Sequence, residues 1–112
     1  MNLYNRSKRK KLGTVRRAAG FLARLTGLLF RNPARHPEAL WIVPCGAVHT
    51  VGMREPLDIF FLAKDLKILK IARGVKPFSL CVYSSGASSV LEFFPGTWDP
   101  SAAEAGDQLE IE

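Results

Sequence analysis

The segment Cys45-Gly46-Ala47-Val48-His49-Thr50 places a thiol and an imidazole four residues apart, with a hydroxyl beside the imidazole. A cysteine nucleophile needs a nearby base to raise its thiolate fraction, and Asp58 could orient the imidazole. These residues define one hypothesis, a Cys/His-dependent hydrolase or transferase. In an extended chain, however, residues four apart are separated by about 13 Å. Gly46 permits a turn that would join them but does not demand one.

Metal binding is the second chemistry to consider, because soft and borderline metals take three or four cysteine, histidine or carboxylate ligands. Only four residues supply nitrogen or sulfur ligands, namely Cys45, Cys81, His36 and His49. Cys45 and His49 could be two ligands and Asp58 a third, but the chain has no CxxC, HxH or HxxxH spacing and no phosphate-binding loop ending in GKS or GKT. The sequence therefore predicts no metal site and implies no cofactor.

Asp58 is the unusual residue, because it lies within the apolar run Pro56–Phe61. A carboxylate that is buried there needs hydrogen-bond or charged partners. The candidates are His49, Thr50, Arg54 and the amides of the preceding loop. We expect Asp58 to hold that loop in place rather than to act in catalysis.

Arg54 lies close to His49 and Thr50 in the sequence and could bind an anion or a carboxylate. This favours a non-enzymatic binding or accessory domain whose partner is a small polar or anionic ligand, or a protein segment. The residues predicted to form its site are Cys45, His49, Thr50, Met53, Arg54 and Asp58, with Trp41 and Glu92 nearby.

Short strands must position these residues. The runs 57–63 and 66–72 are predicted to form a hairpin across the Lys64-Asp65 turn. Further strands are predicted at 40–44, 80–83 and 90–94, a helical turn at 101–105, and a terminal strand that contains Leu109 and Ile111. Several short strands at this spacing favour a small sandwich or barrel.

An amphipathic helix is predicted over Val15–Phe30, because apolar residues recur there at helical spacing and Pro33 would stop the helix. Residues 1–14 form a basic tail that is predicted to be disordered. The apolar face of the helix is expected to pack on the domain core, although a basic amphipathic helix could also lie on an anionic membrane. The expected fold is thus mainly β, α+β by content, with one N-terminal helix.

Charge is unevenly distributed along the chain. The first 35 residues hold ten of the sixteen basic residues and no acidic residue, whereas the rest of the chain has a net charge of −4. A basic end of this kind suggests contact with nucleic acid or an anionic membrane through residues 1–12. No aromatic residue interleaves the run Arg6–Lys11 as a stacking partner would, which favours a solvated tail.

Composition limits the number of domains, the membrane topology and the compartment that the sequence predicts. The 112 residues, 47% of them hydrophobic, suffice for one domain with a core. The chain contains no run of 18 apolar residues that would predict a transmembrane helix. Cys45 and Cys81 are interpreted as reduced thiols, which predicts a cytoplasmic location.

The segment CGAVHTVGMREPLDIFFL resembles the signature of the Domain of Unknown Function 192 family. That pattern has a His-Thr or Asn-Thr step, here His49-Thr50, followed by a loop, a proline, an aliphatic residue and an aspartate, here Pro56-Leu57-Asp58. The segment 24–31 resembles the opening helix of the family. The run Val90-Leu91-Glu92 before Pro95-Gly96, and Gly106-Asp107 before Leu109, resemble its last strands.

The resemblance implies a small jelly-roll-like or barrel-like β domain with a flanking helix over residues 15–112. The segment 97–105 matches less closely, which suggests a loop insertion, and the basic residues 1–12 have no counterpart in the family pattern. The resemblance implies no activity, so function has to be argued from the site.

Overall fold

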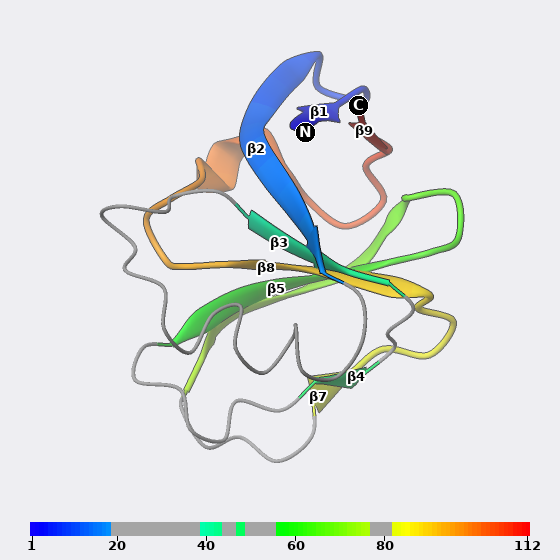
Figure 1. Ribbon diagram of the computed structural model, residues 1–112, viewed down its shortest axis with the longest axis vertical. Helices are drawn as coiled ribbons and strands as arrows, with labels where there is room; N and C mark the ends of the chain where they lie inside the picture. Colours follow the sequence, from blue (N-terminus) through cyan, green and yellow to red (C-terminus); the bar gives the residue numbers. More distant parts are fainter. Residues whose placement is uncertain (19–38, 44–46, 49–55, 77–81) are drawn as a thin grey trace.

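The computed structural model of the chain describes residues 1–18, 39–43, 47–48, 56–76 and 82–112. Within these residues the chain forms strands and one short 3-10 helix (Figure 1). The elements are β1 (Asn2–Asn5), β2 (Lys10–Ala18), β3 (Ala39–Ile42), β4 (Ala47–Val48), β5 (Leu57–Leu62), β6 (Ile68–Val75), β7 (Val82–Tyr83), β8 (Ser89–Phe93), η1 (Pro100–Ala102) and β9 (Leu109–Ile111).

Seven strands form one sheet in the order β6-β5-β8-β3-β2-β1-β9, and β4 pairs separately with β7. The two ends of the large sheet meet, because Lys67 pairs with Gln108 in an isolated bridge. Around this bridge the Ile68 amide donates to the Asp107 carbonyl at 2.9 Å, and the Leu109 amide donates to the Leu66 carbonyl at 3.2 Å. The sheet therefore curls back on itself, which leaves fewer unpaired edge groups.

Strand β2 connects the two halves of this sheet. Its first part, Lys10–Thr14, pairs antiparallel with β1, and its second part, Val15–Ala18, pairs parallel with β3. Gly13 lies near the end of the first part with a φ of 149°, a conformation that favours glycine. The long curved strand in Figure 1 follows from this change of partner.

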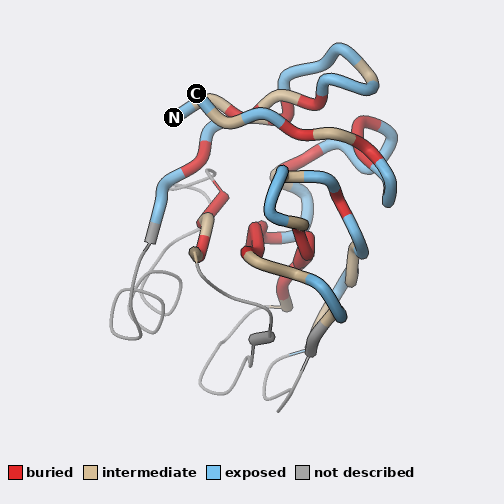
Figure 2. Tube along the Cα trace, turned by 90° about the vertical axis from the view of Figure 1, so that its right-hand side faces the viewer, coloured by how far each residue is buried: buried red, intermediate tan, exposed pale blue. Residues whose placement is uncertain are grey.

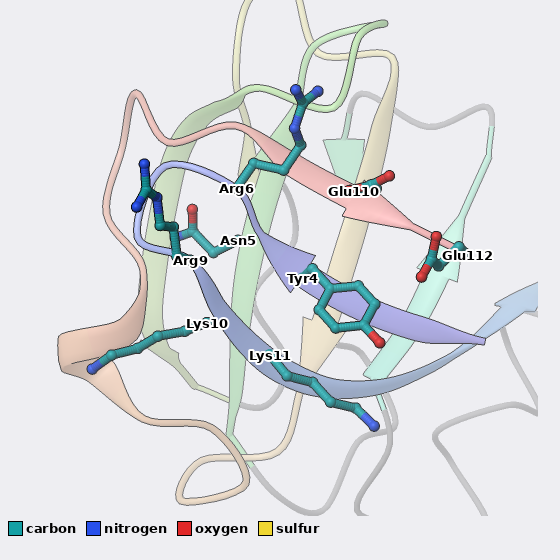
Figure 3. A pocket seen from close by; sticks show the side chains of 8 residues that line it. All are labelled: Tyr4, Asn5, Arg6, Arg9, Lys10, Lys11, Glu110 and Glu112. Carbon is teal, nitrogen blue, oxygen red and sulfur yellow. The ribbon is translucent and has the colours of Figure 1, made fainter.

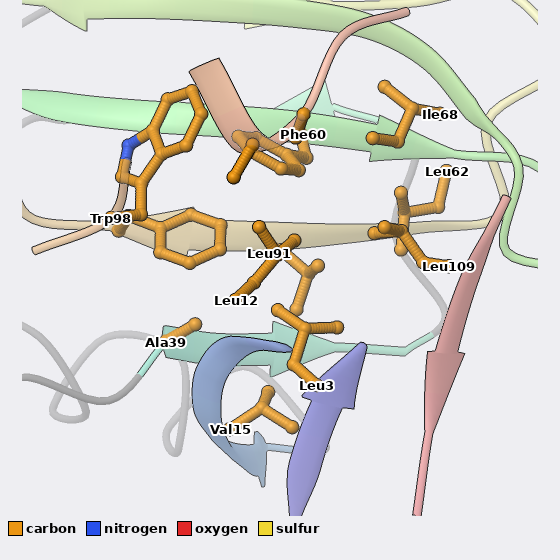
Figure 4. Close-up of a cluster of buried hydrophobic side chains, with 13 residues drawn as sticks. Leu3, Leu12, Val15, Ala39, Phe60, Leu62, Ile68, Leu91, Trp98 and Leu109 are labelled. Atoms are coloured by element: carbon orange, nitrogen blue, oxygen red, sulfur yellow. The ribbon is translucent and has the colours of Figure 1, made fainter. Parts of the chain in front are cut away.

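The central strands β5 and β8 are buried over their whole length. A strand that is covered on both faces has a continuous apolar run instead of strict alternation, as in LDIFFL. One face carries the larger apolar cluster, which includes Leu3, Phe60, Leu91 and Trp98 (Figure 4). The other face carries a second cluster around Ile59, Phe61 and Val90. Figure 2 shows buried stretches gathered in the interior of the molecule and exposed stretches at its outer turns.

The α+β prediction with an N-terminal helix is wrong for the described residues. Val15–Ala18, where the helix was predicted to begin, are in β2, and the only described helical element is η1. Residues 19–30 of the predicted helix lie outside the described residues. The apolar residues whose spacing indicated the helix begin at Ala18, so that spacing did not itself decide between helix and strand for Val15–Arg17.

The predicted disordered tail is also wrong, since β1 and the first part of β2 form a hairpin within residues 1–14. Its partners are distant in the sequence: Leu3 pairs with Ile111, and Tyr4 pairs with Glu110. Within the described part of the chain, no helix is long and apolar enough to cross a membrane.

The predicted hairpin of strands across Lys64-Asp65 is confirmed as β5 and β6. The terminal strand is confirmed as β9, and the predicted helical turn corresponds to η1. In η1 the side chain of Asp99 accepts a hydrogen bond from the Ser101 amide, and Pro100 occupies the first helical position. Both residue types are typical of a helix start.

Asn5 joins the N-terminal hairpin to the C-terminal segment. Its side chain is fully buried, and its Nδ2 donates to the Ala102 carbonyl and to Asp107 Oδ2, both at 2.8 Å. Its Oδ1 accepts from the Lys8 amide at 3.2 Å. Lys8 Nζ lies 2.9 Å from Glu104 Oε1 and 3.3 Å from Asp107 Oδ2. These contacts tie residues about a hundred positions apart, and we call them the Asn5 clamp.

Because the Asn5 clamp contains the Asp107 carboxylate, the stability of the folded state should vary with pH in the acid range. Burial alone would raise the pKa of Asp107, but hydrogen bonds from Asn5, the Glu104 amide and Lys8 outweigh it and lower the pKa below its ordinary value of 3.8. The folded state therefore gains stability from the ionised carboxylate above pH 3.8, and that gain is lost as the pH falls through the lowered pKa. Urea titrations should show a stability difference between wild type and Asp107→Asn that is constant near neutral pH and shrinks in acid. A difference that does not change with pH would contradict this role.

Candidate functional site

Asp58 lies on β5 opposite an irregularity in β6. The register between these strands shifts between Leu57 and Ile59, so that Arg73 and Gly74 face Asp58 as a bulge. Gly74 has a φ of 62°, a left-handed conformation that glycine adopts without steric cost. Bulges of this kind re-aim side chains and backbone groups near functional sites.

Both carboxylate oxygens of Asp58 accept hydrogen bonds. The Gly74 amide donates to Oδ1 at 2.7 Å, and Trp98 Nε1 donates to Oδ2 at 2.8 Å. The residue is only 4% exposed. A buried Asp58 was expected to need partners, and it has two donors, but neither is among the candidates predicted in the preceding loop. His49, Thr50 and Arg54 lie outside the described residues.

Trp98 belongs to an aromatic cluster behind this carboxylate. Its ring lies 4.8 Å from the Phe60 ring in an edge-to-face arrangement and 5.7 Å from the Phe93 ring. Phe60 and Phe93 are in turn 4.7 Å apart. Figure 4 shows Trp98 beside Phe60 at one end of the larger cluster. Because the indole is held by packing on one side and by Asp58 on the other, its orientation is fixed.

An open hollow of about 430 Å³ lies over this arrangement. The hollow is lined by Asp58, Arg73, Gly74, Pro95, Gly96, Trp98 and Pro100, and we call it the Trp98 hollow. The guanidinium carbon of Arg73 lies 5.8 Å from the centre of the Trp98 ring, within the range of a cation–π contact. Arg73 is itself exposed. The hollow therefore combines one accessible cation with an indole and two prolines.

The structure describes three of the eight predicted site residues and separates them. Trp41 lies on the same face of the sheet as Asp58, but β8 runs between their strands, which implies a separation of about 10 Å between those strands. Glu92 is buried on the opposite face, where it pairs with Leu40 and Ile59 of the second cluster. Of the three, only Asp58 lines the Trp98 hollow.

Trp41 lies beside Arg17 of β2 and not at the Trp98 hollow. The guanidinium carbon of Arg17 lies 5.7 Å from its ring centre. Its Nε1 is buried and makes no hydrogen bond in the described structure.

The other five predicted site residues, Cys45, His49, Thr50, Met53 and Arg54, lie outside the described residues. The Cys/His enzyme hypothesis therefore stays a prediction. Among the residues that are described, no group of three or more His, Cys, Asp or Glu could hold a metal ion.

Sequence reasoning missed Arg73, Gly74 and Trp98. Trp98 falls in the segment that was interpreted as a loop insertion, yet it is only 7% exposed. One signal was available: a buried Asp58 requires donors, and the indole N–H of tryptophan is a donor only. The pairing was hidden because 40 positions separate the two residues.

In the part of the chain that the structure describes, these features define a small, mainly β domain with a curled seven-stranded sheet and a hollow built around a buried carboxylate. The chain belongs to the DUF192 family, described as "Uncharacterized ACR", whose model matches residues 3–111. The match confirms the resemblance found in the sequence. It also includes most of residues 1–12, so the expectation that they have no family counterpart is wrong.

One relative in sequence and two solved structures are similar to this chain. A UPF0127 protein of Pyrococcus furiosus is 30% identical over 101 residues, 86% of this chain and 84% of that protein. A "putative transcription regulator" from Sinorhizobium meliloti 1021 has a TM-score of 0.78 at 25% identity, with 97% of this chain and 89% of that chain covered. A protein of unknown function from Novosphingobium aromaticivorans DSM 12444 shares the fold with a TM-score of 0.76 at 23% identity, with 97% and 81% covered.

Proposed function

We propose that this protein is a non-enzymatic binding domain and that the Trp98 hollow takes a small ligand with a carboxylate next to an apolar body. One observation carries the proposal: the accessible guanidinium of Arg73 lies over the Trp98 ring at the Trp98 hollow. That ring is held in place by packing and by Asp58. Ligand sites commonly combine apolar walls with a few fixed polar groups.

The chemistry of the lining supports a carboxylate ligand. Arg73 supplies the N–H donors that a carboxylate prefers. Pro95, Trp98 and Pro100 supply the apolar wall against which the body of the ligand would rest. Both oxygens of Asp58 already accept hydrogen bonds within the fold. Asp58 therefore supports the site by orienting Trp98 and the bulge.

Titration with small organic acids tests this proposal. We expect hexanoate and benzoate to change the fluorescence of Trp98 in a Trp41→Phe background, which leaves Trp98 as the only tryptophan. Hexanol and hexylamine should have less effect, since they lack the carboxylate. Arg73→Ala should weaken hexanoate binding about tenfold, the value expected for loss of one charged hydrogen-bonded contact.

The matched control is Arg16→Ala, which removes the same charge from β2 without touching the hollow. It should leave the hexanoate affinity unchanged. Equal weakening by both variants would show a general charge effect and contradict the site. If none of the acids binds but an extended peptide does, a protein segment is the partner and the small-ligand proposal fails.

A further inference from the structure

We propose that a second site, on the N-terminal hairpin, binds single-stranded nucleic acid. This site is a hollow of about 460 Å³, and Asn5 of the clamp is one of its lining residues. Its lining is Tyr4, Asn5, Arg6, Arg9, Lys10, Lys11, Glu110 and Glu112, and we call it the basic hollow (Figure 3). It shares no residue with the Trp98 hollow.

The basic run Arg6–Lys11 contains no aromatic residue, but in the folded hairpin Tyr4 lies beside it. Tyr4 pairs with Lys11 of β2 on one side and with Glu110 of β9 on the other. The three side chains thus form one row across three strands. Figure 3 shows the Tyr4 ring among the charged side chains of the hollow, with its face turned outward. A base can stack on such a ring while nearby cations contact the phosphates.

The cations of the basic hollow are available to a ligand. Arg6, Arg9 and Lys11 are exposed. Lys10, by contrast, lies close enough to Asp99 to lower the pKa of that carboxyl, after the larger effect of its hydrogen bonds from Ser101. We therefore assign phosphate contacts to Arg6, Arg9 and Lys11. Lys8 is excluded because it is engaged in the Asn5 clamp.

The conformation of Arg9 is a second, independent observation. Its φ is 54°, in the left-handed region, which costs a residue with a side chain about 1–2 kcal/mol relative to glycine. Glycine or asparagine would fit this turn position with less strain. The chain instead has an arginine whose side chain lines the basic hollow, as expected where strain accompanies function.

The hollow is also rigid before binding, because the Asn5 clamp ties the hairpin to residues 102–107. A preformed site avoids the entropy cost of ordering on association. Single-stranded nucleic acid fits better than an anionic membrane. Apart from Met1 and Leu69, the structure describes no large exposed hydrophobic residue that could enter a bilayer, whereas stable membrane binding needs apolar burial besides charge.

Fluorescence anisotropy with a labelled single-stranded oligonucleotide of mixed sequence tests this proposal. With about three phosphate contacts, the affinity should fall roughly 20-fold between about 50 and 200 mM salt. Arg6→Ala combined with Lys11→Ala should remove about 1.4 from the salt slope. Tyr4→Leu should weaken binding about tenfold through loss of stacking, whereas Tyr4→Phe should bind like wild type.

The control is Lys70→Ala combined with Lys76→Ala, which removes the same net charge from residues outside the basic hollow. It should change the affinity less than twofold, and circular dichroism should confirm that every variant is folded. Equal losses in the two double variants would overturn the proposal. It would also be overturned by the absence of oligonucleotide binding, by equal binding of Tyr4→Leu and wild type, or by binding only to anionic phosphatidylglycerol vesicles or inorganic phosphate.

Discussion

Replacing Asp58 with alanine should lower the free energy of unfolding by about 3 kcal/mol, because a buried indole N–H and a partly buried backbone amide lose their acceptor. These donors are the Gly74 amide and Trp98 Nε1. Asp58→Asn should cost nearly as much, since an amide side chain offers only one oxygen and places an N–H against the other donor. Urea denaturation at neutral pH measures both effects.

The matched control is Asp65→Asn, an exposed aspartate that accepts one hydrogen bond from the Lys67 amide. It should change stability by less than about 0.5 kcal/mol. A double-mutant cycle of Asp58→Ala with Trp98→Phe isolates the carboxylate–indole pair, and we expect a coupling of about 1–2 kcal/mol. No coupling, together with a small Asp58→Ala effect, would show that the contact does not hold the site together.

The second large effect is expected for Asn5→Ala. This change removes three hydrogen bonds of a fully buried side chain. It leaves the Ala102 carbonyl and the Lys8 amide unsatisfied and takes a donor from Asp107, so stability should fall by about 3 kcal/mol. Because the clamp supports the hairpin, amide hydrogen exchange in β1 and β9 should accelerate more than in β5.

Asn2→Ala on the same strand provides the comparison. Asn2 contributes backbone hydrogen bonds to Glu112 at 2.7 and 3.0 Å, and these survive the substitution. We expect a change below about 0.5 kcal/mol. If Asn2→Ala and Asn5→Ala destabilise the protein equally, the effect belongs to β1 in general, and the clamp has no special role.

Local patterns predicted the strands whose own apolar run or alternation can be recognised within a few residues of sequence. The β5–β6 hairpin could be predicted because Lys64-Asp65 separates two apolar runs, and β9 because Leu109 and Ile111 alternate with polar residues. The N-terminal prediction failed because β1 and β2 complete the sheet by pairing with β9 and β3. Basic residues on β2 resembled a solvated tail, since the exposed face of a strand tolerates charge as readily as a tail does.

The sequence by itself determined which residue had to be explained: a carboxylate at Asp58 within an apolar run requires partners wherever the chain folds. It also determined the family, since its short motifs occur in the family's order along the chain. Only the tertiary structure decided that Trp98 and Gly74 are those partners, that Glu92 faces away from them, and that Tyr4 joins the basic residues. The physical reason is that strand pairing and burial bring together residues far apart in sequence, and a local pattern does not record which distant strand will be adjacent.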